Sequence, residues 1–504
     1  MSDLFLNLNH VTFAYDSATD ALFQDMSLHA ATGWSGIIGA NGTGKTTLLK
    51  LATGILQPAE GQIHLPLNLI YCPQRTDEVP NRFNDLISAN TKSAHIIKSL
   101  LGIYDDWVDR WSTLSHGERK RAQIAVALWL EPDVLAIDEP TNHVDALASE
   151  IISRALHSFK DIGLIVSHDR ELLDSLCYQC IFIDPPEVIT RPGGYTHAVK
   201  VIEEEQQAVK KQYLLKKSAL KKLKKEVNRR KVEAQQSQKK RSKKGLAKKD
   251  HDAREKKDRA RVTGKDAVAG KLQKQLSGRL AQVSAQFGRI KIKKDQTLGI
   301  WLPGSVSQRD YLVHLPASFL SLGGQKQLNY PELLIKPKDR IGITGANGSG
   351  KSTLIRYIID KINAPRENIT YIPQEIPLER SQQILNEALA LPNEKLGHLM
   401  TIVSRLGSMP QRLLESTEPS PGEFRKLLLA LGMTYEPHII IMDEPTNHLD
   451  LPSIECLEQA LSDCPCCLVL VSHDKYFLEK LTEIRWDIAQ ASKVDGKYVL
   501  RILY

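Results

Sequence analysis

Two short stretches of the sequence carry residues that together could hold a polyphosphate. "GANGTGKT" occupies residues 39–46 and returns as "GANGSGKS" at residues 345–352, each after an apolar stretch. Glycines in this pattern let backbone N–H groups close around phosphate oxygens, and the start of the following helix adds positive potential. We therefore predict two phosphate-binding loops, each with a lysine for the outer phosphates and a hydroxyl for Mg²⁺. The loop residues are Gly39, Asn41, Gly42, Gly44, Lys45, Thr46 and Thr47, and Gly345, Asn347, Gly348, Gly350, Lys351, Ser352 and Thr353.

Paired carboxylates follow a buried-strand pattern in each half. "VLAIDE" ends at Glu139 and "IIIMDE" ends at Glu444. Parallel α/β sheets bind their ligands at the carboxyl ends of strands, so Asp138 and Asp443 are expected to hold the metal. Each glutamate would then polarise the water that attacks the γ-phosphate. The alternative, an N-cap of a following helix, is less favoured because a phosphate loop accompanies each pair.

Further motifs return in the same order. "VSHD" ends an apolar strand at His168 and again at His473, where each histidine could touch the γ-phosphate and the attacking water. "YCPQ" at Gln74 returns as "YIPQ" at Gln374, and "LSHGE" at residues 114–118 aligns with "PSPGE" at residues 419–423. Several motifs repeated at a nearly constant offset indicate an internal duplication.

The basic charge is concentrated between the two copies. The chain has a net charge of +8, but residues 201–294 hold 31 Lys and Arg against 10 Asp and Glu, so the remainder is acidic. A solvated linker is the simple interpretation, yet an excess of this size favours a polyanionic partner, with nucleic acid ahead of a membrane surface. We predict three domains: residues 1–197, a basic linker at 198–294, and residues 295–504.

Two apolar stripes at helical spacing flank the most basic part of the linker. They predict an antiparallel pair of helices packed on each other. A first helix over about residues 198–233 would be on the order of 50 Å long at 1.5 Å per residue, and would carry a basic tip at residues 235–261. The stripes comprise Val209, Tyr213, Leu220, Leu223 and Val227, and Leu272, Leu276, Leu280 and Val283.

Other classes of protein are disfavoured by composition. No apolar run approaches the roughly 20 residues that span a bilayer, and the start "MSDLFLNLNH" is unlike a secretory leader, so we expect a cytoplasmic protein. Seven cysteines, an odd number, argue against a disulfide framework. Cys177 and Cys180 have the spacing of zinc ligands, but they lack partners at finger spacing, and we favour buried thiols.

These motifs together resemble the ATP-binding cassette superfamily, over nearly the whole chain. In that superfamily two cassettes pair head to tail, so that the signature of one covers the ATP held by the other. The resemblance implies that Asp145 and Asp450 lie at the shared interface, and that Gln74 and Gln374 contact the nucleotide and its Mg²⁺. Ser420, Gly422 and Glu423 would complete the site of Lys45, and Ser115, Gly117 and Glu118 would complete the site of Lys351.

Within the superfamily, "EPTNHxD" in both halves and the long charged linker resemble the ABC-F family. This resemblance implies an α/β fold with two P-loop ATP-binding cassette domains joined by a long basic α-helical hairpin linker. It also implies an ATP hydrolase, working as a monomer with an intramolecular cassette pair and without a stable membrane partner. The linker would contact the rRNA and tRNA of a ribosome. Members include translation factors and antibiotic-resistance factors, and the sequence leaves this choice open.

Two other functions are weighed against this one. An energy-coupling ATPase subunit of a membrane transporter would copurify with an integral membrane protein, and would give the basic hairpin no task. A DNA-maintenance ATPase would prefer duplex DNA to ribosomes, and its cassettes usually carry zinc modules or very long coiled coils. The ribosomal interpretation alone uses every large feature of the chain.

The two halves depart from the family pattern at different places. Tyr15 could stack on adenine in the first half, whereas the same spacing from the second phosphate loop arrives at Ser321. The second signature has proline on both sides of Ser420, and proline removes a backbone donor. We therefore hypothesise two unequal ATP sites: the one with Tyr15 holds adenine better but closes on the weaker signature.

Overall fold

A computed structural model describes residues 4–16, 20–142, 144–241, 255, 265–288, 304–324, 326–406, 408, 421–447, 449–491 and 496–503. Contacts divide the chain into two compact units. The first unit contains Met1–Ala198 and Leu298–Tyr504, and therefore both predicted cassettes. The second unit, Val199–Thr297, contains the predicted linker.

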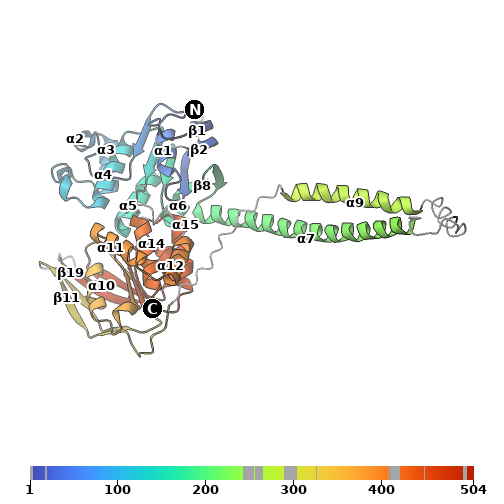
Figure 1. Ribbon diagram of the computed structural model, residues 1–504. Helices are drawn as coiled ribbons and strands as arrows, with labels where there is room; N and C mark the ends of the chain where they lie inside the picture. The colour runs from blue at the N-terminus through green and yellow to red at the C-terminus, as the bar shows by residue number, and fades with distance from the viewer. Residues whose placement is uncertain are drawn as a thin grey trace. The chain divides into compact units, whose positions relative to one another are not determined.

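The first cassette is built from two sheets and a set of helices (Figure 1). Its strands are β1 (Phe5–Phe13), β2 (Phe23–Ala31), β3 (Gly33–Gly39), β4 (Glu60–His64), β5 (Leu69–Cys72), β6 (Val134–Asp138), β7 (Ile162–Val166), β8 (Cys177–Asp184) and β9 (Glu187–Pro192). Its α-helices are α1 (Lys45–Ala52), α2 (Phe83–Ser88), α3 (Lys92–Leu101), α4 (His116–Trp129), α5 (Ala146–His157) and α6 (Arg170–Leu176), with 3₁₀ turns at Asp105–Trp107 and Trp111–Thr113.

The second cassette repeats this construction. Its strands are β10 (Val313–Leu315), β11 (Ser318–Gly323), β12 (Lys326–Tyr330), β13 (Leu333–Ile335), β14 (Arg340–Gly345), β15 (Ile369–Ile372), β16 (Ile439–Asp443), β17 (Cys467–Val471), β18 (Ile484–Gln490) and β19 (Lys497–Leu503). Its α-helices are α10 (Lys351–Asp360), α11 (Leu378–Leu389), α12 (Asn393–Arg405), α14 (Pro421–Met433), α15 (Leu451–Ser462) and α16 (Lys475–Leu481), with a 3₁₀ turn at Arg366–Asn368.

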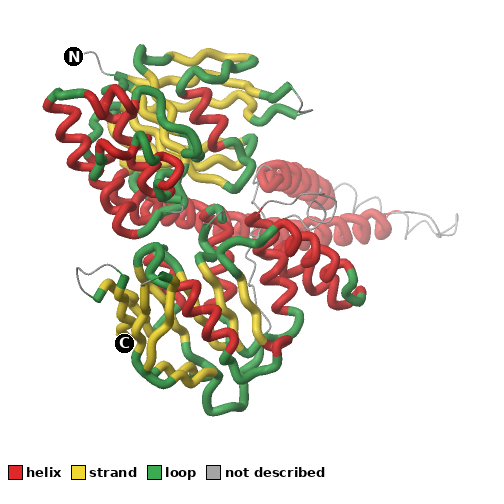
Figure 2. The backbone as a smooth tube through the Cα atoms, turned by 90° about the vertical axis from the view of Figure 1, so that its left-hand side faces the viewer, coloured by secondary structure: helices red, strands yellow, loops and turns green. Residues whose placement is uncertain are grey.

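The order of strands shows the duplication directly. The main sheet of the first cassette runs β5-β6-β7-β3-β8-β9, and that of the second contains the matching run β15-β16-β17-β14-β18-β19, extended by β12 and β11. In both runs only the last pair of strands is antiparallel. Figure 2 shows helices lying against the strands of each cassette. The predicted α/β fold with two cassettes is confirmed.

The central strands are apolar because both faces of the sheet are covered. Every residue of β6, β7, β16 and β17 is buried. Parallel pairing brings the carboxyl ends of these strands to one edge, where β3 and β14 also lead into their phosphate loops. The phosphate loop, the paired carboxylates and the histidine after "VS" therefore meet at this edge in each cassette.

The linker contains two long helices, α7 (Tyr195–Arg241) and α9 (Lys265–Gly288). The Tyr213 ring stacks on the Phe287 ring, with centroids 4.8 Å apart, so the helices run antiparallel in this unit as predicted (Figure 1). Val209 departs from the predicted stripe and is exposed. Of the basic tip at residues 235–261, residues 235–241 extend α7, and residues 242–254 and 256–261 lie outside the described residues.

Among the described residues, none of the helices combines the length and the apolar character that a membrane span requires.

Candidate active sites

Each phosphate loop is shaped by a glycine that begins a helix. Gly44 and Gly350 precede α1 and α10 with φ of 97°, in the left-handed region. A Cβ on Gly44 would lie 2.8 Å from the side chain of Leu22, and one on Gly350 would lie 2.6 Å from that of Leu322. Both the backbone angle and the available space therefore require glycine here.

The two loop lysines are buried beneath their loops. Lys45 Nζ donates to the Gly39 carbonyl at 2.9 Å, and Lys351 Nζ donates to the Gly345 carbonyl at 2.7 Å. Burial lowers the pKa of both ammonium groups, although nearby carboxylates of the acidic turns oppose this effect. A bound polyphosphate would supply the anionic partner that these cations lack within the loop.

The hydroxyl after each lysine lies beside the first carboxylate of the acidic turn. Thr46 Oγ1 donates to Asp138 Oδ2 at 2.7 Å, and Tyr71 donates to the same oxygen at 3.3 Å. Ser352 hydrogen-bonds Asp443 in the same way, while Asp443 Oδ1 is buried without a hydrogen-bond partner among the described residues. Hydroxyl and carboxylate oxygens are the ligands that Mg²⁺ prefers, so these residues fit that cation.

Glu139 and Glu444 adopt the same uncommon backbone conformation. Their φ angles are 48° and 50°, in the left-handed region that costs a residue with a side chain about 1 kcal/mol. The Glu139 amide donates to the Val166 carbonyl at 2.9 Å, and the Glu444 amide donates to Val471 at 2.9 Å. These bonds tie each glutamate to the strand that leads to the histidine of the same cassette.

The histidines lie against these glutamates. His168 Nε2 is 2.9 Å from Glu139 Oε1, and His473 Nε2 is 3.3 Å from Glu444 Oε1. Burial, with the charge of Lys351, lowers the pKa of His473 to about 4. Burial raises the pKa of Glu444 to about 8, against the attraction of Lys351. In the second cassette the imidazole is thus neutral near neutral pH, beside a carboxyl group that titrates close to this range.

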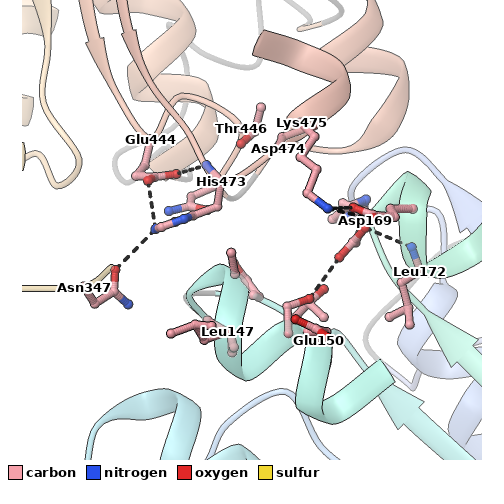
Figure 3. Close-up of a pocket in the computed structure, with 18 of the residues that line it drawn as sticks. Leu147, Glu150, Asp169, Leu172, Asn347, Glu444, Thr446, His473, Asp474 and Lys475 are labelled. Atoms are coloured by element: carbon pink, nitrogen blue, oxygen red, sulfur yellow. Dashed lines mark hydrogen bonds and ion pairs between the residues drawn. The ribbon is translucent and has the colours of Figure 1, made fainter. Parts of the chain in front are cut away.

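A cavity of about 890 Å³ opens over the second phosphate loop. Asn347, Lys351, Glu444 and His473 line one side of it, and α5 and α6 of the first cassette line the other. Figure 3 shows His473 between Asn347 and Glu444, with Leu147 of α5 on the facing wall. The signature residues predicted to cover this loop, Ser115, Gly117 and Glu118, are not among the lining residues.

The side chains beside the two phosphate loops differ between the cassettes. Tyr15 is exposed, and its hydroxyl is 2.8 Å from Thr47 Oγ1, so this side chain lies beside the first phosphate loop. In the second cassette, Leu322, one residue beyond Ser321, lines the cavity and faces Gly350. Leu22 faces Gly44 in the same way, so the first site has an aromatic ring in addition to this aliphatic contact.

The two signatures begin their helices differently. Ser115 caps α4 and exchanges hydrogen bonds with Glu118 in a capping box, with Gly117 buried between them. In the second cassette, Pro421 opens α14, and Gly422 is buried behind it. Proline suits the first turn of a helix but lacks the N–H that His116 keeps at the equivalent position. Pro419 and Ser420 lie outside the described residues.

Gln74 and Gln374 are exposed, and their backbone carbonyls are held by cations that the sequence motifs did not reveal. Lys120 Nζ lies 3.4 Å from the Gln74 carbonyl, and an Arg425 Nη donates to the Gln374 carbonyl. Both cations lie two residues beyond the glutamate of a signature. In the sequence, what could have identified these two cations is their shared position two residues after the "GE" of each signature.

The acidic turn of the second cassette reaches the phosphate loop of the first. The Asn41 amide donates to Asp450 Oδ2 at 2.6 Å, while Oδ1 of the same carboxylate caps α15 through the Ser453 amide at 2.9 Å. Burial alone would raise the pKa of Asp450, but these hydrogen bonds and the charge of Lys426 lower it. Asp450 thus joins the two cassettes as the resemblance implied.

Comparisons with known proteins agree with this geometry. The family described as ABC transporter matches residues 23–142 and 328–447. The chain is 29% identical over 462 residues to the ribosome protection protein VmlR of Bacillus subtilis, covering 89% of this chain and 80% of that protein. It is 25% identical over 525 residues to the energy-dependent translational throttle protein EttA of Escherichia coli K12, covering 91% and 88%.

A solved structure shares the fold at lower identity. The archaeal ribosome recycling factor aABCE1, crystallised with the ribosomal stalk protein aP1, matches 97% of this chain and 89% of its own, with a TM-score of 0.60 and 17% identity. At this identity the likeness concerns the fold alone.

Proposed function

Since the chain belongs to the ABC-F family of tandem ATP-binding cassette proteins, we propose that it binds the ribosome near the tRNA exit site when its cassettes hold ATP. There it acts through its linker on peptidyl-tRNA or the peptidyl-transferase centre. The names of the relatives concern ribosome protection and translation, which favours this function over a transporter subunit. A ribosomal partner also implies a cytoplasmic location.

The contact between Asn41 and Asp450 carries the proposal. It joins the loop that would hold one ATP to the turn that follows the catalytic carboxylate of the other cassette. ATP would add phosphate contacts on both sides of this junction, and a ligand favours the state to which it binds better. Nucleotide occupancy can therefore control how the cassettes pair within one monomeric chain.

The chain is an ATP hydrolase, and each candidate residue has a role in that reaction. Lys45 and Lys351 bind the outer phosphates, and Glu139 and Glu444 accept a hydrogen bond from the attacking water. His168 and His473, which contact these glutamates, orient that water toward the γ-phosphate. The sites close when Ser420, Gly422 and Glu423 cover the first ATP, and Ser115, Gly117 and Glu118 cover the second.

Mg²⁺ would neutralise charge on the β- and γ-phosphates. The residues that would hold it are Thr46, Asp138 and Gln74 in the first cassette, and Ser352, Asp443 and Gln374 in the second. The orphaned buried Oδ1 of Asp443 supports this assignment.

The linker supplies the surface for RNA. Residues 198–294 form the proposed basic domain between cassettes at 1–197 and 295–504, and the described part of α7 carries many exposed lysines. Cationic side chains along a helix bind phosphate backbones with little dependence on base sequence. We assign the linker to rRNA and tRNA contacts on this ground.

Ribosome co-sedimentation of the Glu139→Gln/Glu444→Gln protein tests the proposal. The amide variants should bind ATP without hydrolysing it, so the bound form accumulates. We expect co-migration with ribosomes that requires ATP and weakens as salt rises. A Lys45→Ala/Lys351→Ala protein is the control that should not co-migrate. Intact ATP binding without co-migration at any salt concentration would contradict the ribosomal function.

A further inference from the structure

Lys120 is a fully buried cation that connects three segments of the first cassette. It lies on α4, two residues after Glu118. Its Nζ contacts the carbonyl of Pro73 at 2.8 Å and that of Gln74 at 3.4 Å, in the segment after β5. It also lies 3.3 Å from the carbonyl of Asp138, at the end of β6. One ammonium group thus joins the signature helix to the backbone of two of the three predicted Mg²⁺ ligands, Gln74 and Asp138.

Arg425 makes the same connection in the second cassette with different chemistry. It is buried on α14, two residues after Glu423. Its guanidinium donates to the carbonyl of Gln374 and lies 3.4 Å from that of Glu444. A third acceptor, the Asn447 carbonyl, lies in the acidic turn. Since an ammonium and a guanidinium perform the same task in the two halves, the requirement is for a buried multiple donor.

Burial of these cations is costly, so their contacts must offset a desolvation penalty of several kcal/mol. Burial lowers the pKa of Lys120 to about 8 and also lowers that of Arg425, with nearby carboxylates opposing the shift. The acceptors are backbone carbonyls, which are strong hydrogen-bonding groups. A purely structural role would stop there, whereas three of these carbonyls belong to residues that would hold the metal, namely Gln74, Asp138 and Gln374.

We propose that Lys120 and Arg425 are positioning residues for Mg²⁺-dependent nucleotide binding, each fixing the glutamine segment against the end of the carboxylate strand. This inference rests on the proposed assignment of the ATP sites. A movement of the signature helix would then be transmitted to the metal ligands of its own cassette. Neither side chain contacts the nucleotide or the reacting atoms, so neither is a catalytic residue.

Equilibrium binding of a fluorescent, non-hydrolysable ATP analogue, with and without Mg²⁺, tests this role in the full chain. Lys351→Ala serves as the parent background, so that the first site is observed. In Lys120→Met, the gain in affinity that Mg²⁺ gives should be about tenfold smaller than in the parent. The affinity measured in EDTA should change less than twofold. Lys120→Arg, which copies the second cassette, should stay within threefold of the parent in both conditions.

Arg121→Met is the matched control. Arg121 is the next cation on α4 and also donates to a carbonyl, that of Leu101 at 2.8 Å, which lies far from the glutamine segment in sequence. The Arg121→Met variant should lower thermal stability without changing the Mg²⁺ increment, which is the gain in affinity for the analogue when Mg²⁺ is present. If Lys120→Met lowers affinity equally with and without Mg²⁺, or leaves the increment intact, the positioning role is wrong.

The experiment also distinguishes a variant that does not fold from a wrong assignment of the ATP site. If Lys120→Met does not fold, Lys120→Arg decides the question, since loss of its Mg²⁺ increment in a folded protein would overturn the inference. If the parent shows no Mg²⁺ increment, the site assignment itself fails, and the positioning role fails with it. Ribosome binding enters neither measurement, so failure of the ribosomal proposal is detected independently.

Discussion

Arg170 of the first cassette forms an ion pair with Glu458 of the second, and both side chains are almost fully buried. Arg170 lies two residues beyond His168, and Lys480 also donates to Glu458, at 3.0 Å. The equivalent cation of the second cassette, Lys475, instead pairs at 2.9 Å with Glu171, and both of those side chains are exposed. The contacts that join the cassettes are therefore unequal on their two sides.

This inequality predicts unequal effects on stability. Arg170→Met leaves Glu458 buried with a single cationic partner, and breaking a buried ion pair costs roughly 3 kcal/mol. Lys475→Met removes an exposed pair, which contributes less than about 1 kcal/mol. Thermal unfolding should show a clear drop in Tm for the first variant and little change for the second. Equal drops would mean that the buried pair does not join the cassettes in solution.

Adenine binding should depend on Tyr15 more than on Leu322. Stacking on an aromatic ring contributes about 1 kcal/mol beyond the area that it buries. We expect Tyr15→Ala to weaken nucleotide binding at the first site about tenfold, measured in a Lys351→Ala background. Leu322→Ala, measured in a Lys45→Ala background, should weaken binding at the second site less. A larger effect for Leu322→Ala would contradict the assignment of the adenine positions.

Turnover should be divided unequally between the sites. The site of Lys351 is expected to close on the capped helix beginning at Ser115, whereas the other closes on a helix that starts with Pro421. Glu444→Gln should therefore remove the larger share of ATP hydrolysis, and Glu139→Gln the smaller share. Steady-state phosphate release measures both. Equal losses would refute the hypothesis of unequal sites.

The raised pKa of Glu444 predicts a pH dependence with a definite sign. The ionised carboxylate polarises the attacking water more strongly than the neutral carboxyl group does, so hydrolysis in a Glu139→Gln background should rise as pH increases through about 8. Stability should move in the opposite direction. The pKa is about 4.5 unfolded and about 8 folded, so the stability that the neutral group contributes is complete below pH 4.5 and is lost as pH rises to 8.

The isosteric amide gives the control for this effect. Glu444→Gln has no proton to lose, so its Tm should rise relative to the original protein as pH increases from 4.5 to 8. The gain should then level off. A constant difference in Tm across this range would show that the carboxyl group is not buried in the way the structure indicates.

The hairpin should depend on the stacked pair of Tyr213 and Phe287. Replacing either ring by alanine should speed limited proteolysis of the linker, and replacing both should add little, because stacked rings contribute about 1 kcal/mol as a pair. Val209→Ala, at an exposed position of the same helix, is the control. Fully additive effects in the double variant would mean that the two rings do not interact.

The sequence predicted those parts of the sites that are encoded locally. Phosphate loops and the strands before the carboxylates have fixed spacing and a clear apolar pattern, and the structure places Thr46 beside Asp138 and His168 beside Glu139. The apolar stripes also predicted the antiparallel helices of the linker. The absence of an aromatic residue at Ser321, at the spacing of Tyr15, stays a prediction about the second site.

Contacts between segments that are distant in the sequence could not be predicted in the same way. Lys120 and Arg425 bind backbone carbonyls, which every residue possesses, so their partners cannot be identified from residue types. Arg170 and Glu458 lie in different cassettes and have no equivalent pair in the duplicated positions, where Ser153 corresponds to Glu458. Such interactions depend on how the elements pack, which periodicity does not encode.

The left-handed backbone at Glu139 and Glu444 sets activity against stability. Every residue with a β-carbon meets the same cost of about 1 kcal/mol there, and only glycine would avoid it. Glutamine therefore removes the charge while leaving the backbone cost unchanged. In the proposed mechanism each cassette tolerates a less stable turn in order to aim a carboxylate at the attacking water, as in other stability–activity trade-offs.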